Sequence, residues 1–241
     1  SVARTERAPT LDELYSTEAE VQRGPLFFGA RTPSLSLEPE TATTVELGLS
    51  YEGYDVLNEG DVLQAKVTAF HNDIDNLIAT TPRPAGPAPG QPTVPYFSNI
   101  DEARIWGIEL EGAYEADRWF GQAAYSRVRS EDVATGDTLT DTPADTLSLT
   151  VGGKAPAQGL RYGWRGTWAG DITTASAETS APGYVTHDLF LDWTPVRGPL
   201  EGATVSFAVE NVTDVDYRPN LQLDAAPGRT FKIAVTREFD W

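Results

Sequence analysis

The chain of 241 residues has 36 acidic against 18 basic side chains and a formal net charge of −18, which argues against nucleic acid as a partner. Cysteine is absent, and this excludes a disulfide framework, a cysteine-ligated metal site and thiol catalysis. No run approaches about 18 uninterrupted apolar residues, so no transmembrane helix is expected. No secretory signal opens the chain.

Apolar and polar side chains alternate with a period of two, which predicts about ten strands, most of about nine residues or more. After the opening residues, the alternation recurs near 45–51, 63–69, 106–114, 119–125, 147–151, 162–172, 185–193, 203–209 and 229–241. The last segment is the clearest. One face carries Phe231, Ile233, Val235, Phe239 and Trp241, and the other carries Thr230, Lys232, Ala234, Thr236 and Glu238. Only Leu11 to Glu20 suggests a short helical turn.

The connections alternate between long and short. Long ones are expected near 8–40, 73–101, 131–144, 173–182 and 213–227, and short ones near 55–61, 116–118, 156–159 and 196–201. Transmembrane β-barrels have this asymmetry, and their strands are about 9–11 residues long, whereas soluble strands average about 5–6. Aromatic residues at predicted strand ends fit interfacial girdles. They are Tyr51, Trp119, Trp193, Phe239 and Trp241. A soluble β protein is the alternative.

The opening predicts a partial barrel. The first strand is followed by about thirty loop residues and needs a partner that precedes residue 1. A sheet with open edges is not tolerated in hydrocarbon, and a wide, plugged barrel needs about 22 strands. We therefore expect residues 1–241 to be the C-terminal portion of one all-β, antiparallel transmembrane β-barrel domain. It would hold about the last ten strands and no plug domain.

Five short motifs resemble those of TonB-dependent outer-membrane receptors, especially the haem and haemoglobin uptake group. Residues 7–15, Arg-Ala-Pro-Thr-Leu-Asp-Glu-Leu-Tyr, resemble the family's "FRAP…ELY" stretch, and residues 32–40, Thr-Pro-Ser-Leu-Ser-Leu-Glu-Pro-Glu, resemble "NPNL-x-PE". Residues 96–109, 209–217 and 227–231 are similar to "Y-x-N-x-x-x-A-x-x-x-G-x-E", "V-x-N-L-x-D-x-x-Y" and "P-G-R-x-F". Their order and spacing extend over nearly the whole chain.

The resemblance implies active uptake of an iron-containing ligand and no enzymatic activity. Haem would be a transported ligand and not a built-in cofactor, and no metal site is expected. Partners would be outer-membrane lipid, the upstream barrel and plug of the same receptor, the TonB complex through that plug, and haem, a haem protein or a metal chelate. Long loops would be extracellular and the C-terminus periplasmic. The candidate ligand-binding residues lie in the first long loop: Arg7, Pro9, Tyr15, Phe27, Phe28, Pro33 and Leu35.

The chain departs from the haem group in that loop. Ser16 to Arg31 contains no histidine, although haem receptors of this group typically have an iron ligand between the two opening motifs. Thr32 and Ser34 replace the two asparagines of "NPNL", and Glu6 replaces the aromatic residue of "FRAP". Recognition of a haem protein through loop contacts, a siderophore or other metal chelate, and a passive barrel without energy coupling therefore stay open.

Other features have ordinary structural interpretations. His71 and His187 fall on the apolar parity of their strands and suit interfacial positions better than ligation. Asp73-Ile74-Asp75-Asn76 predicts a turn in preference to a calcium loop. Glu109 and Glu111 predict a hydrated wall and not a glycosidase pair. The proline-rich stretch 81–90 predicts a stiff exposed loop.

Overall fold

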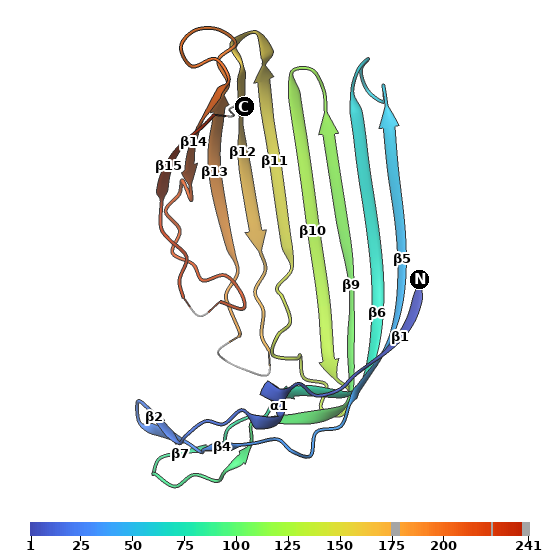
Figure 1. Cartoon of the computed structure of the whole chain (residues 1–241), viewed down its shortest axis with the longest axis vertical. Helices are drawn as coiled ribbons and strands as arrows, with labels where there is room; N and C mark the ends of the chain where they lie inside the picture. The colour runs from blue at the N-terminus through green and yellow to red at the C-terminus, as the bar shows by residue number, and fades with distance from the viewer. Residues whose placement is uncertain (175–178, 223, 238–241) are drawn as a thin grey trace. The chain divides into compact units, whose positions relative to one another are not determined.

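The structure is a computed structural model that describes residues 1–174, 179–222 and 224–237. Ten strands form one antiparallel sheet, and their order along the chain is their order across the sheet (Figure 1). They are β1 (Val2–Arg7), β5 (Glu40–Tyr54), β6 (Val62–Thr80), β9 (Phe97–Glu115), β10 (Trp119–Asp132), β11 (Thr146–Ala155), β12 (Leu160–Ala169), β13 (Tyr184–Trp193), β14 (Ala203–Glu210) and β15 (Thr230–Arg237). The predicted ten-stranded, antiparallel, all-β fold is confirmed.

The connections hold the remaining elements. These are α1 (Leu11–Tyr15), β2 (Val21–Arg23), β3 (Leu26–Phe28), β4 (Arg31–Thr32), β7 (Ala85–Gly86), β8 (Val94–Pro95) and the 3-10 helix η1 (Pro156–Gln158). The predicted helical turn exists but ends at Tyr15. The described residues hold no helix that could traverse a bilayer. Glu238, Phe239 and Trp241, predicted to continue the last strand, lie outside the described residues.

The chain divides into two compact units. The first, here called the loop unit, comprises residues 1–46, 70–106 and 130–137. The second, here called the wall unit, comprises residues 47–69, 107–129 and 138–241.

One face of the wall unit is an apolar belt, because the strand registers align the apolar positions of β10 to β15 in lateral rows. One row is Tyr125, Leu147, Trp168 and Val185, and another is Val151, Trp164, Leu189, Val209 and Phe231. On β13 the belt covers residues 185 to 193, close to the 9–11 residues of a strand that crosses a bilayer. The belt comprises Trp119, Gly121, Ala123, Tyr125, Leu147, Leu149, Val151, Gly153, Tyr162, Trp164, Gly166, Trp168, Val185, His187, Leu189, Leu191, Trp193, Val205, Phe207, Val209, Phe231, Ile233 and Val235.

Many large side chains of this belt are exposed, including Val151, Leu189, Phe207 and Ile233. A water-soluble sheet would bury such a face against a second layer, because exposed apolar area costs about 25 cal/mol per Å². Their exposure is what a sheet covered by hydrocarbon requires.

The opposite face of the wall unit is mostly polar, with Gln122, Thr150, Arg165 and Asp188 in one lateral row. The neighbouring row differs, because it consists of Phe120, Gly152, Gly163 and Phe190. The two phenyl rings have centroids 6.3 Å apart, and Phe120 is only 2% exposed. The side chains of both phenylalanines lie against the two glycines, where a Cβ atom would come within 2.6 Å of a ring carbon. The guanidinium of Arg161 covers Phe120 at 3.7 Å.

The short connection 55–61 is organised by the carboxylate of Asp61, which is 1% exposed. It accepts hydrogen bonds from the backbone N–H groups of Val56, Leu57 and Asn58 at 2.6–2.9 Å and from the Tyr114 hydroxyl at 2.6 Å. Burial raises the pKa of Asp61, but these hydrogen bonds, Tyr114 first, outweigh it and lower that pKa to about 2. This aspartate therefore stays ionised and fixes the turn.

Two predictions about the second long connection are wrong. The loop expected over 73–101 covers only 81–96, because β6 continues to Thr80 and β9 already begins at Phe97. Asp73-Ile74-Asp75-Asn76 is therefore strand and not a turn. Ile74 and Ile78 are buried, and Asn76 has a left-handed φ of 57°. Asparagine and aspartate favour turns when taken locally. Here the pairing of long antiparallel strands overrides that preference.

Candidate functional site

The first long loop starts with α1, which is fixed by a capping box. The Thr10 hydroxyl accepts from the Glu13 N–H at 3.2 Å, and the Glu13 carboxylate accepts from the Thr10 N–H at 2.7 Å. A helix of five residues is not stable alone. Forming its first turn fixes the backbone of several residues, and the conformational entropy lost exceeds the free energy gained from so few hydrogen bonds. Its conformation therefore depends on this cap and on the contacts of Glu13 with the rest of the loop unit.

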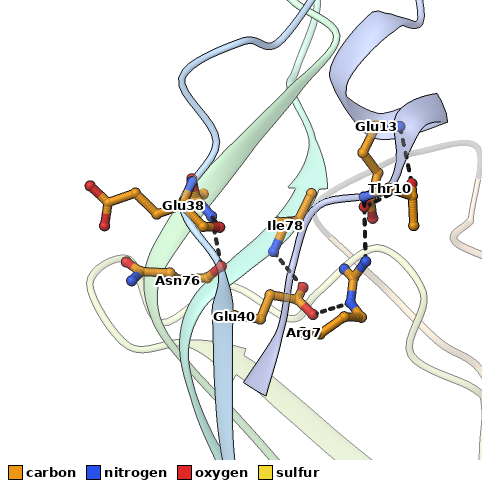
Figure 2. A network of polar contacts seen from close by, with 8 residues as sticks. Arg7, Thr10, Glu13, Glu38, Glu40, Asn76 and Ile78 are labelled. Atoms are coloured by element: carbon orange, nitrogen blue, oxygen red, sulfur yellow. Dashed lines mark hydrogen bonds and ion pairs between the residues drawn. The ribbon is translucent and has the colours of Figure 1, made fainter. Parts of the chain in front are cut away.

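Arg7 joins the two motifs that frame this loop (Figure 2). Its guanidinium donates to Glu13 at 2.8 Å and to Glu40 at 2.6 Å, and Glu40 also accepts from the Ile78 N–H at 2.7 Å. The hydrogen bond from Arg7 lowers the pKa of Glu13 to about 2, against an opposing effect of burial and with help from Thr10. β1, α1, β5 and β6 are thus tied at one point.

The second motif is held by Ser34 and Asn99. The Ser34 N–H donates to the Leu14 carbonyl at 2.8 Å, and its buried hydroxyl accepts from the Phe97 N–H at 2.7 Å. The Asn99 amide donates to the carbonyls of Glu38 at 3.0 Å and of Asn76 at 2.7 Å, and it accepts from the Glu38 N–H at 2.9 Å. Residues 32–40 are therefore fixed against both α1 and the start of β9.

The proline-rich connection docks onto the first long loop. Arg83 forms an ion pair with Glu18 at 2.6 Å and donates to the carbonyls of Gly29 and Ala19, both at 2.9 Å. Arg31 pairs with the same Glu18 at 3.3 Å and donates to the Thr81 carbonyl at 2.9 Å. β3 pairs with β7, and β4 pairs with β8. Residues 17–32 and 81–96 thus form one structure.

The structure places the seven candidate residues in three settings. Arg7 is in the ion-pair network, and Pro9 precedes the helix cap. Tyr15 and Leu35 are 62% and 67% exposed. Each follows directly after one of the two residues, Leu14 and Ser34, that a backbone hydrogen bond joins. Pro33, which precedes Ser34, is also exposed. Phe27 and Phe28 are half-buried in β3, where the Phe28 ring lies 5.9 Å from the guanidinium groups of both Arg23 and Arg83.

The sequence reasoning missed several residues of this unit. Glu40, Ser34, Arg83 and Glu18 were not candidates, because their partners are distant in sequence. Leu11 was also missed, although it is 75% exposed.

The two histidines lie against tryptophan rings. His71 is 3.2 Å from an Asp73 carboxylate oxygen, and its ring centroid is 6.5 Å from that of Trp106. His187 stacks on Trp164 at 5.7 Å. Within residues 1–174, 179–222 and 224–237, no three acidic or histidine side chains are placed to hold a metal ion.

Comparison with known proteins identifies the class that this sheet and loop unit define. The family model described as "TonB dependent receptor-like, beta-barrel" matches residues 1–212. The chain therefore belongs to this family. It is a family of receptors and not of enzymes, and the ten strands match the C-terminal part of its barrels.

The similar proteins include several named for haem. A hemin receptor of Yersinia pestis is 28% identical over 90% of this chain and 32% of its own length, and TonB-dependent heme receptor A of Haemophilus influenzae is 27% identical over 98% and 34%. The Serratia marcescens hemophore receptor HasR, solved in complex with its hemophore HasA and heme, superposes with a TM-score of 0.73 at 21% identity over 99% of this chain and 36% of that chain. The copper transporter OprC gives 0.76 at 19% identity over 97% and 36%. The chain spans about a third of the length of the curated relatives it matches.

Proposed function

We propose that this chain forms the C-terminal part of the barrel in a TonB-dependent outer-membrane receptor that takes up haem or haem from a haem protein. The main support for this proposal is that a hemin receptor and a heme receptor align with 90% and 98% of this chain. The upstream barrel and plug would complete the receptor, and the TonB complex would act through the plug. Long loops would be extracellular and the C-terminus periplasmic.

The loop unit is the proposed ligand-binding region. Tyr15 and Leu35 are exposed, yet the backbone beside them is fixed by the Leu14–Ser34 hydrogen bond. Apolar side chains on a fixed backbone bind at a lower cost in conformational entropy than those on a free loop, which favours them as contact residues. In this proposal Pro33, Phe27 and Phe28 extend the contact surface, while Arg7 and Pro9 hold α1 in place.

The loop favours recognition of a haem protein over ligation of haem iron. Ser16 to Arg31 contains no histidine, whereas apolar side chains such as Tyr15 and Leu35 are suited to a protein surface. A metal chelate stays as the second candidate, because a copper transporter and a ferric enterobactin receptor have the same fold at similar identity.

The experiment uses the full receptor in cells that depend on haem iron. Growth on a haem protein should require both the receptor and TonB. TonB-independent growth would favour a passive barrel. The purified receptor should form a stable complex with the haem protein, and the absence of a complex, together with growth on a ferric siderophore, would favour the chelate receptor.

The contact residues are tested by alanine substitution. Tyr15→Ala and Leu35→Ala should each weaken binding of the haem protein roughly tenfold, as for interface residues that contribute about 1–2 kcal/mol. Leu57→Ala is the matched control, because Leu57 is 68% exposed but lies in the short connection 55–61. Equal loss in the control would contradict this placement of the site.

A further inference from the structure

One face of α1 is apolar and exposed. Leu11 and Tyr15 are four residues apart, so their side chains are neighbours on the same face of the helix, and both are more than half exposed. The hydrogen bond from the Ser34 N–H to the Leu14 carbonyl brings the exposed Leu35 close to Tyr15. Leu11, Tyr15 and Leu35, here called the α1 patch, all belong to the loop unit. They present apolar area that a partner surface can cover.

The two segments that form the α1 patch are acidic. Residues 8–22 and 32–46 contain seven carboxylates and no lysine, arginine or histidine. Of these carboxylates, Glu13, Glu18 and Glu40 are paired with the arginines of the loop unit described above. The other four leave the two segments with an unbalanced negative charge.

Asp12 and Glu38 are the exposed carboxylates nearest in sequence to the α1 patch. Asp12 follows Leu11 directly, and Glu38 is three residues after Leu35, a length of chain that spans at most about 11 Å. In the part of the chain that the structure describes, neither carboxylate forms an ion pair. Figure 2 shows that the Glu38 carboxylate points away from the network around Arg7. Both charges therefore remain available to a partner.

We propose that the α1 patch docks a haem protein whose contacting face is apolar at its centre and lined with lysine or arginine at its rim. This inference rests on the proposed function and adds the charge of the partner. Asp12 and Glu38 attract a basic face and repel an acidic protein or an anionic metal chelate, so they determine specificity. Leu11 joins Tyr15 and Leu35 as a contact residue.

The two kinds of residue should affect different rate constants. Charges at the rim of an interface act mainly on the association rate and on its salt dependence, because they steer the encounter. Truncation of an apolar contact acts mainly on the dissociation rate. A residue that only stabilises the loop would not produce this division.

The test measures both rate constants by surface plasmon resonance on the full receptor in neutral detergent. The probes are cytochrome c, which is a basic haem protein, and its lysine-acetylated form, which lacks most of the positive charge. At an ionic strength of about 10 mM, where screening is weak, native cytochrome c should associate at least about tenfold faster than the acetylated form. Its association rate should fall as salt is raised to about 150 mM.

The variants assign the effect to the α1 patch. The double variant Asp12→Asn with Glu38→Gln should associate about fivefold more slowly at low salt, with a dissociation rate within about twofold of the unsubstituted receptor. The matched control is Glu59→Gln with Asp117→Asn, which removes two exposed carboxylates from the short connections and should change neither rate. Leu11→Ala should dissociate about threefold faster with an unchanged association rate, and alanine keeps the helix because of its high propensity.

Several results would overturn the proposal. These are no binding of cytochrome c, equal or faster association of the acetylated form, an association rate that rises with salt, and an equal loss in the control variant. TonB-dependent growth on a haem protein together with any of them would overturn the basic partner and leave the proposed function intact. Hydrogen exchange of the Ser16 N–H shows whether α1 is still folded, and if Asp12→Asn opens it, Glu38→Gln alone decides.

Discussion

Removal of the Arg7 side chain should release α1 from the loop unit. Arg7→Ala deletes both hydrogen bonds to Glu13 and Glu40 and leaves two neighbouring carboxylates without their cation. A charge-assisted hydrogen bond contributes about 1.5–3 kcal/mol when buried, and an exposed ion pair about 0–1 kcal/mol. Because the Arg7 side chain is 44% exposed, we expect a loss of about 1–2 kcal/mol in the free energy of opening α1.

Hydrogen–deuterium exchange of the full receptor measures this opening. The N–H groups of Glu13, Leu14 and Ser16 are bonded within α1 and its cap, and their exchange should accelerate by about 5- to 30-fold. Arg4→Ala is the control, because Arg4 lies on the same strand but outside the network, and it should leave these rates unchanged. Unaltered exchange of α1 in Arg7→Ala would refute the view that the ion pairs hold this helix.

Three further predictions concern pH, a turn and a close approach. The pKa of Glu13 is depressed to about 2, so its contribution to the loop unit is present above the ordinary value of 4.5 and is lost as pH falls from there toward 2. The protection factors of the α1 N–H groups, which correct the measured rates for the intrinsic exchange rate at each pH, should therefore fall across that window, and constant protection factors would contradict the pairing. Asp61→Asn should lower the thermal unfolding midpoint of the receptor more than Asp55→Asn does. The Asp61 carboxylate accepts four hydrogen bonds, whereas that of Asp55 accepts one, from the Gly60 N–H. Equal midpoints in the two variants would show that Asp61 does not organise the turn. Gly152→Ala should lower the free energy of unfolding of the barrel in urea by about 1–3 kcal/mol, because the new Cβ would lie 2.4 Å from the Tyr162 carbonyl oxygen. Gly121→Ala is the control and should change this free energy little, because the atom nearest to its Cβ would be 3.8 Å away.

The lateral glycine and phenylalanine row shows what the alternation of side chains does not reveal. Phe120 and Phe190 occur on the polar parity of their strands, where period two predicts contact with water. The register places them beside Gly152 and Gly163, and the missing side chains let the rings lie flat on the sheet. A sequence pattern reports one strand at a time, whereas this packing depends on four strands at once.

The sequence alone determined the number and class of the strands, the apolar face and the family. These follow from local information, because side-chain alternation is a property of each strand and a bilayer demands the same pattern in every strand. It also indicated the loop framed by Arg7 and Glu40 as the candidate site. Only the tertiary structure decided how that loop is built. Pairing between β6 and β9 keeps Asp73 to Asn76 in a strand although these residues favour a turn. Arg83 and Glu18 are far apart in sequence but form an ion pair, because antiparallel strands return the chain to the same end of the sheet.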